Sequence, residues 1–100
     1  MAAIIKWTYE AQETFEQNIN YLEKHWGENE IRNFVKQVEQ IILKIEKSPE
    51  MYSPSAKSQY VRKVTVNKYI VLYYKYYPGK NEIILLTFWH NKQDPGKLKY

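Results

Sequence analysis

The 100-residue sequence contains few side chains that could carry out catalysis. Cysteine is absent, and the two histidines, His25 and His90, do not form a His-x-x-x-His pair, so the usual nitrogen and sulfur ligands of a metal site are missing. Asp94 is the only aspartate, which argues against a hydrolase with paired carboxylates. There is also no Gly-x-Ser-x-Gly motif and no glycine-rich phosphate loop. We therefore expect no metal and no cofactor.

Metal-free cleavage of RNA is the one chemistry that these residues still permit. It requires a base for the 2′-hydroxyl, an acid for the leaving oxygen and a cation on the phosphate. Arg62 could contact the phosphate, His90 could transfer the proton, and Lys92 could assist. The structural alternatives are that Arg62 pairs with a helix carboxylate or the C-terminus, and that His90 lies at the edge of the core beside Phe88 and Leu86.

Charge is divided unevenly between the two halves of the chain. Residues 1–50 contain six Lys or Arg and nine Asp or Glu (−3), whereas residues 51–100 contain nine and two (+7). The second half is therefore predicted to present a positive surface to an anionic partner, which could be nucleic acid or an acidic protein segment. The alternative is a lysine-rich surface that only keeps the protein soluble.

The elements that must position these residues follow from the hydrophobic pattern. A short apolar run predicts a strand at residues 3–7, and apolar residues spaced three and four apart predict a helical hairpin at 8–47, capped by Thr8 and interrupted at Gly27. Runs rich in Val, Ile and Tyr predict strands at 60–66, 69–77 and 82–90, followed by a tail at 91–100. We expect one α+β domain, residues 1–100, with the order β-α-α-β-β-β and the hairpin on one face of a twisted antiparallel sheet.

The last predicted strand is apolar on both of its faces. Strict alternation places Ile83, Leu85 and Trp89 on one face, and Ile84, Leu86 and Phe88 on the other. Because the helical hairpin can cover one face only, we expect the other to be covered by residues 91–100 or by a bound partner. The strand tyrosines are interpreted as packing residues instead of base-stacking ones.

Several segments, in this order and spacing, resemble the RelE/ParE superfamily of toxins from bacterial type II toxin–antitoxin systems. They are 7–11 (WTYEA), 21–27 (YLEKHWG), 45–49 (IEKSP), 60–64 (YVRKV), 68–73 (KYIVLY), 82–86 (EIILL) and 88–95 (FWHNKQDP). The resemblance implies a growth-inhibiting toxin, often a plasmid stabilisation factor, that is neutralised by a cognate antitoxin. An acidic antitoxin segment would match the basic half of the chain, and we expect it to contact Lys63, Lys68, Tyr73, Trp89 and Lys97.

The superfamily contains two mechanisms, and the resemblance is closer to the ParE branch, whose members poison DNA gyrase. The helix end at 21–27 and the histidine in the last strand favour that branch. RelE-like members cut mRNA on the ribosome; Arg62 matches their strand arginine, His90 could match a C-terminal histidine, and Lys92 could replace a missing arginine. The RelE-like endoribonuclease therefore stays open as an alternative, as does a non-toxic binding module of the same fold.

Neither a membrane segment nor a signal peptide is expected. No apolar run approaches the roughly 20 residues that cross a bilayer, and residues 1–6 lack a charged region followed by a long apolar stretch. The sequence thus predicts a cytoplasmic protein.

Overall fold

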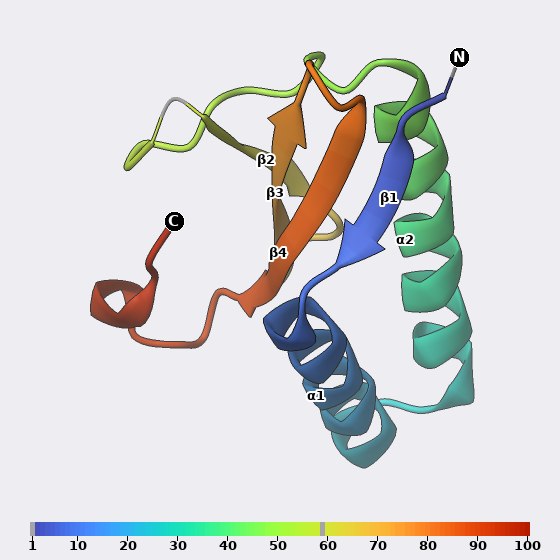
Figure 1. Ribbon diagram of the computed structural model, residues 1–100. Helices are drawn as coiled ribbons and strands as arrows, with labels where there is room; N and C mark the ends of the chain where they lie inside the picture. The colour runs from blue at the N-terminus through green and yellow to red at the C-terminus, as the bar shows by residue number, and fades with distance from the viewer. Residues whose placement is uncertain (1, 59) are drawn as a thin grey trace.

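The computed structural model describes residues 2–58 and 60–100, and it has the predicted order of elements (Figure 1). These elements are β1 (Ile4–Trp7), α1 (Tyr9–His25), α2 (Glu28–Lys47), β2 (Val61–Thr65), β3 (Ile70–Tyr77), β4 (Glu82–His90) and a short 3-10 helix, η1 (Pro95–Lys97). The α+β prediction is confirmed, with helix and strand ends within a residue or two of those expected.

Capping and a glycine define the helical hairpin. The Thr8 hydroxyl accepts a hydrogen bond from the Ala11 amide at 3.0 Å and donates to the Leu85 carbonyl at 2.8 Å, so the start of α1 is joined to β4. Gly27 connects the helices with a φ of +157°, within the range that favours glycine. The hairpin packs its apolar stripe, which includes Phe34 and Ile45, on one face of the sheet.

The sheet has the strand order β1-β4-β3-β2 and is mixed instead of wholly antiparallel. The last three strands form the predicted antiparallel meander, but β1 pairs parallel to β4, with Ile4 opposite Glu82. The helical hairpin makes this possible, because a long helical connection can return the chain to the same end of the sheet. Strand β4 therefore lies between β1 and β3.

A β-bulge in β4 changes the predicted facing of its second half. Tyr73 lies opposite Thr87 and Tyr74 lies opposite Leu85, so Leu86 is an extra residue. Phe88 therefore joins Leu85 in the core under the helices, and both are fully buried. The predicted pairing of Phe88 with Leu86 on one face was wrong, because alternation restarts after the bulge. Trp89 shares with Leu86 the face turned away from the helices, which we term the outer face.

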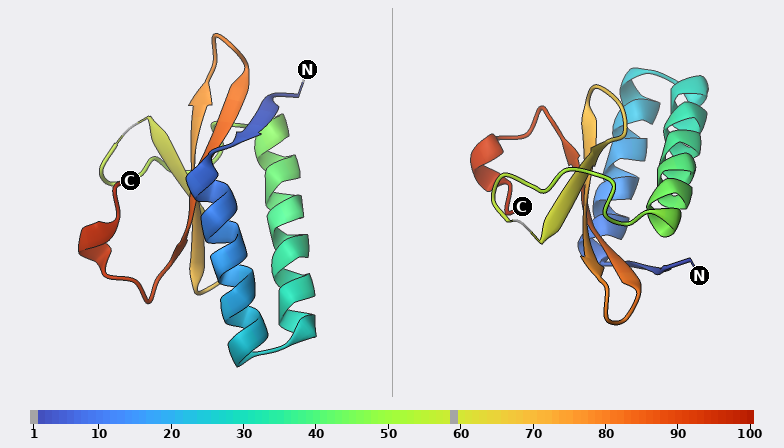
Figure 2. Two further views of the ribbon diagram at one scale, coloured as in Figure 1. Left: turned by 60° about the horizontal axis from the view of Figure 1, so that its bottom comes forward. Right: turned by 90° about the horizontal axis from the view of Figure 1, so that it is seen from above.

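The tail crosses part of the outer face (Figure 2). The Tyr100 ring lies 6.2 Å from that of Tyr73, and the Tyr100 carbonyl accepts a hydrogen bond from the Ser55 hydroxyl. Tyr73 is buried as a result, whereas Leu86 and Trp89 stay half-buried. Of the two predicted covers for this face, the tail thus supplies one, and it leaves part of the face accessible. Among the described residues no helix is long and apolar enough to span a membrane.

Candidate partner-binding surface and basic aromatic row

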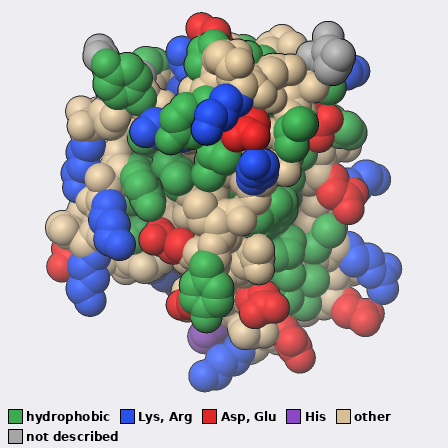
Figure 3. Space-filling view, viewed as in Figure 1, with side chains coloured by type: hydrophobic (Ala, Val, Ile, Leu, Met, Phe, Trp, Pro, Cys, Tyr) green, Lys and Arg blue, Asp and Glu red, His purple; other side chains and the backbone are tan. Residues whose placement is uncertain are grey.

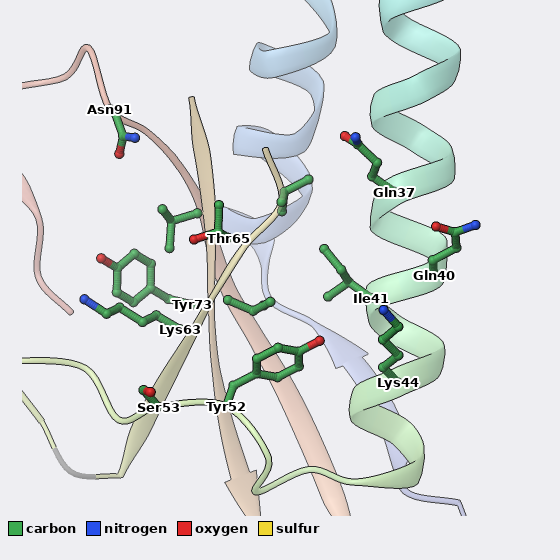
Figure 4. Close-up of a pocket in the computed structure, with 13 residues that line it drawn as sticks. Gln37, Gln40, Ile41, Lys44, Tyr52, Ser53, Lys63, Thr65, Tyr73 and Asn91 are labelled. Atoms are coloured by element: carbon green, nitrogen blue, oxygen red, sulfur yellow. The ribbon is translucent and has the colours of Figure 1, made fainter. Parts of the chain in front are cut away.

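A groove with a volume of about 740 Å³ lies along the β2 edge of the sheet (Figure 4). Gln37, Gln40, Ile41 and Lys44 of α2 line it on the helix side of the sheet, whereas Lys63 and Tyr73 line it from the outer face, so the groove passes around the β2 edge. The groove carries two lysines, and none of its described lining residues is acidic. Its charge therefore suits an anionic or acidic occupant.

The edge of β2 is only partly paired. The backbone groups of Val61 and Lys63 point away from β3, and the segment at 53–55 pairs with them. The Ser55 amide donates to the Val61 carbonyl, and the Lys63 amide donates to the Ser53 carbonyl. This pairing stops at Lys63. By the same alternation the Thr65 amide faces outward, and it has no hydrogen-bond partner among the described residues. The end of the β2 edge at Thr65 can therefore accept another extended chain.

The residues predicted to bind a partner are distributed over this groove, the outer face and two turns. Lys63 and Tyr73 line the groove together, and Trp89 lies opposite Val71, a further lining residue. Lys68 places its ammonium 5.2 Å from the centre of the Tyr69 ring, outside the groove, and Lys97 is exposed in η1. On the side of the molecule seen in Figure 3, cationic and acidic side chains intermingle, so the basic half does not produce a uniform patch there.

Lys44 is a groove residue that the sequence analysis missed. It belongs to the acidic half of the chain and occupies the last turn of α2, where a lysine is also explained by the helix dipole. Nothing in the local pattern shows that α2 returns beside the edge of β2, so no sequence signal could have revealed its position.

Arg62 lies on the helix side of β2 and is bound to its own chain. Its guanidinium donates to the carbonyls of Tyr52 at 2.7 Å and Glu50 at 3.2 Å, and one nitrogen lies 3.9 Å from the Glu50 carboxylate. The neighbouring Tyr74 hydroxyl donates to the Pro49 carbonyl at 2.7 Å. Burial raises the pKa of Tyr74 to about 12, against the opposing effect of the Arg62 charge. These contacts hold the connection from α2 to β2 in place.

The structure does not bring Arg62 close to His90. Arg62 lies opposite Tyr74, and His90 lies opposite Ile70, on the other side of β3. Four residues along a strand correspond to roughly 13 Å, and two strand spacings add roughly 10 Å in the perpendicular direction. A single phosphate therefore cannot touch both side chains.

His90 and Lys92 do lie together, beside Tyr21 of α1. The Lys92 ammonium donates to the Tyr21 hydroxyl at 2.6 Å, and the Lys92 amide donates to His90 Nδ1 at 3.1 Å. The His90 ring lies 4.8 Å from the Tyr21 ring and stacks on Tyr69 at 6.0 Å. We term these residues, with Lys68 over Tyr69, the aromatic row: Lys92, Tyr21, His90, Tyr69 and Lys68.

The aromatic row has a defined protonation pattern. Burial, and to a lesser degree the Lys92 charge, lowers the pKa of His90, which is 8% exposed. The hydrogen bond to Tyr21 raises the pKa of Lys92, which favours its charged form. The row therefore combines a neutral imidazole with a fixed cation. Tyr21 was noticed in the sequence only as part of a helix end, because its partners are about 70 residues away.

The described residues contain no group of three His, Asp or Glu placed to hold a metal.

Comparisons with known proteins agree with this fold. The family model for the ParE toxin of the type II toxin–antitoxin system parDE matches residues 5–95. A solved structure described as the chromosomal ParDE TA system from P. aeruginosa superposes with a TM-score of 0.72 over 89% of this chain and 96% of that chain, at 15% sequence identity, which shows a shared fold. No curated protein matches the sequence significantly. Because the family model covers most of the chain, from β1 to the tail, this protein belongs to the ParE family of type II toxins.

Proposed function

We propose that this toxin inhibits growth by binding DNA gyrase as a protein ligand, without cleaving RNA itself. The observation that supports this is the separation of Arg62 from His90. An RNA-cleaving site that uses Arg62 must place this cation and the proton-transfer groups around one phosphate. Lys92 does lie beside His90, and its part is therefore tested separately below. Here the Arg62 guanidinium donates to two carbonyls of the α2–β2 connection. The His90 imidazole is on β4, opposite Ile70, whereas Arg62 is on β2, opposite Tyr74.

A supercoiling assay with purified gyrase tests the proposal. We expect the toxin to stop supercoiling of relaxed plasmid and to increase the amount of cleaved DNA trapped by detergent. Normal supercoiling at saturating toxin would reject it. Induced expression in cells supplies a second arm, because growth arrest is expected of a toxin and not of a non-toxic binding module.

Transcript-end mapping after induction tests the RelE-like alternative. Cleavage of transcripts at particular codons would favour the endoribonuclease if His90→Gln and Lys92→Ala abolish it while the variant proteins remain folded. If the two variants are as toxic as the parent and no such cuts appear, RNA cleavage by these residues is excluded.

The cognate antitoxin, expected for a member of this family, is proposed to place an acidic extended segment in the groove along β2. Three features support this position: the outward Thr65 amide, the two lysines Lys44 and Lys63, and the absence of an acidic side chain from the described lining residues. A chain added to a sheet edge gains backbone hydrogen bonds, and the lysines would select acidic side chains.

Charge reversal tests this position. Lys63→Glu should weaken the toxin–antitoxin complex by tenfold or more, because it replaces attraction by repulsion in the groove. The matched control is Lys80→Glu, in the exposed β3–β4 turn, which does not line the groove. Equal losses for the two variants, measured by calorimetry, would show that overall charge matters and the groove does not.

A further inference from the structure

The aromatic row borders a second cavity, of about 280 Å³, between α1 and the start of the tail. Its lining residues are Gln17, Asn18, Tyr21, His90, Lys92 and Gln93. No acidic side chain is among these described residues. The cavity lies apart from the groove along β2, which shares no lining residue with it. It is thus a separate candidate site.

Hydrogen-bond donors converge on this cavity. The Lys92 ammonium has three N–H groups and uses one on the Tyr21 oxygen, so two remain. Because Tyr21 accepts that bond, its own O–H is left to donate, and it has no acceptor among the described residues. His90 accepts at Nδ1 from the Lys92 amide, so the proton of the neutral ring is on Nε2, which is a further donor. One fixed positive charge with several donors and no competing carboxylate is the chemistry that an oxyanion requires.

The surroundings favour the phosphate of a nucleic acid over a carboxylate. His25, which is exposed, lies 4.4 Å from the Tyr21 ring on one side, and Tyr69 stacks on His90 on the other. Lys68 places a second cation over Tyr69. Alternation of aromatic rings with cations is typical of surfaces that bind single strands, because rings stack on bases while cations contact the backbone.

We propose that this cavity binds a backbone phosphate of single-stranded nucleic acid, with Lys92, Tyr21 and His90 as donors and the exposed His25 ring as the neighbouring surface for a base. The role is one of binding, with no chemical step. It does not depend on the gyrase proposal, since the site is formed by the toxin alone and is tested without gyrase. If gyrase is the target, the site would let the toxin contact DNA that the enzyme has opened.

The test is binding of a fluorescein-labelled oligothymidylate of about 12 nucleotides, measured by anisotropy on purified toxin at about 50 mM salt. Lys92→Ala should weaken binding about tenfold and lower the slope of log affinity against log salt by about 0.7, the value for one phosphate contact on a single strand. Tyr21→Phe should weaken binding about threefold without changing that slope, because it removes a neutral donor and keeps the ring. Lys92→Arg should recover most of the affinity.

Lys97→Ala is the matched control, since it removes one exposed lysine from the same tail outside the cavity. It should change the affinity by less than about twofold, as expected of a charge that does not touch the strand. A further readout is the NMR titration of His90, whose pKa should rise when the oligonucleotide is bound, because a phosphate beside the ring stabilises the imidazolium.

Three results would overturn the proposal. The first is no binding of the oligonucleotide at low salt. The second is an equal loss for Lys97→Ala and Lys92→Ala, which would indicate diffuse attraction. The third is binding of a glutamate-rich peptide, in place of the oligonucleotide, with the same dependence on Lys92 and Tyr21, which would make the cavity a carboxylate site on a protein partner.

Discussion

Replacement of Arg62 by alanine separates a structural role for this side chain from a catalytic one. The guanidinium is about one-fifth exposed and donates to two carbonyls of the α2–β2 connection. Hydrogen bonds to a charged group contribute roughly 1.5–3 kcal/mol. The ion pair with Glu50, at 3.9 Å and with a carboxylate that is 66% exposed, adds about 0.5 kcal/mol or less. Because the contacts share one side chain they are not additive, and we expect Arg62→Ala to lower the free energy of unfolding by about 2–3 kcal/mol.

Urea denaturation followed by circular dichroism measures this loss, and thermal melting should show a decrease in Tm of roughly 10–20 °C for a domain of this size. Arg62→Lys should recover less than half of the stability, because an ammonium cannot reproduce the planar fork. Glu50→Gln should cost about 0.5 kcal/mol at most, since it removes the weak ion pair and leaves both carbonyl contacts. A loss below about 0.5 kcal/mol for Arg62→Ala would refute the reasoning, and Arg62 would again be available for a role in function.

The pKa of His90 is lowered in the folded protein, so the unfolded chain binds its proton more readily; stability should fall as the pH drops below about 6.5, and His90→Gln should reduce this fall in pH-dependent denaturation curves. Asn18 is buried and its amide donates to the carbonyls of Thr14 at 2.9 Å and Phe88 at 3.0 Å, joining α1 to β4. Asn18→Ala should therefore cost about 2 kcal/mol in urea denaturation, and Asn18→Asp more, because a carboxylate cannot donate to those carbonyls and becomes a buried charge.

Most of the fold could be predicted from the sequence because its elements have strong local signals. Helical periodicity, the cap at Thr8, the hinge at Gly27 and the Val- and Tyr-rich runs each depend on neighbouring residues. The turn between β3 and β4 is equally local: the Lys80 amide donates to the Tyr77 carbonyl at 3.2 Å, and Pro78 occupies the second position, which its fixed φ suits.

What could not be predicted depends on contacts between distant residues or on symmetric patterns. The bulge at Leu86 was hidden because a strand that is apolar on both faces looks the same in either phase. The parallel pairing of β1 with β4 leaves no local mark. Arg62 binds backbone carbonyls, which every residue has, and Tyr21 meets Lys92 only after the sheet has formed.

The parallel pairing of β1 with β4 has a consequence for synthesis. Among the described residues, β1 pairs in the sheet with Glu82–Leu85 alone, and the Thr8 hydroxyl and the Asn18 amide also donate to carbonyls of β4. Until β4 has left the ribosome, β1 has no strand to pair with and α1 can pack on α2 but not on β4, and contacts this far apart in the chain form late. The chain can therefore complete its fold only after β4 has emerged from the ribosome, and a product that ends before β4 lacks the strand on which β1, the Thr8 cap and the Asn18 amide depend.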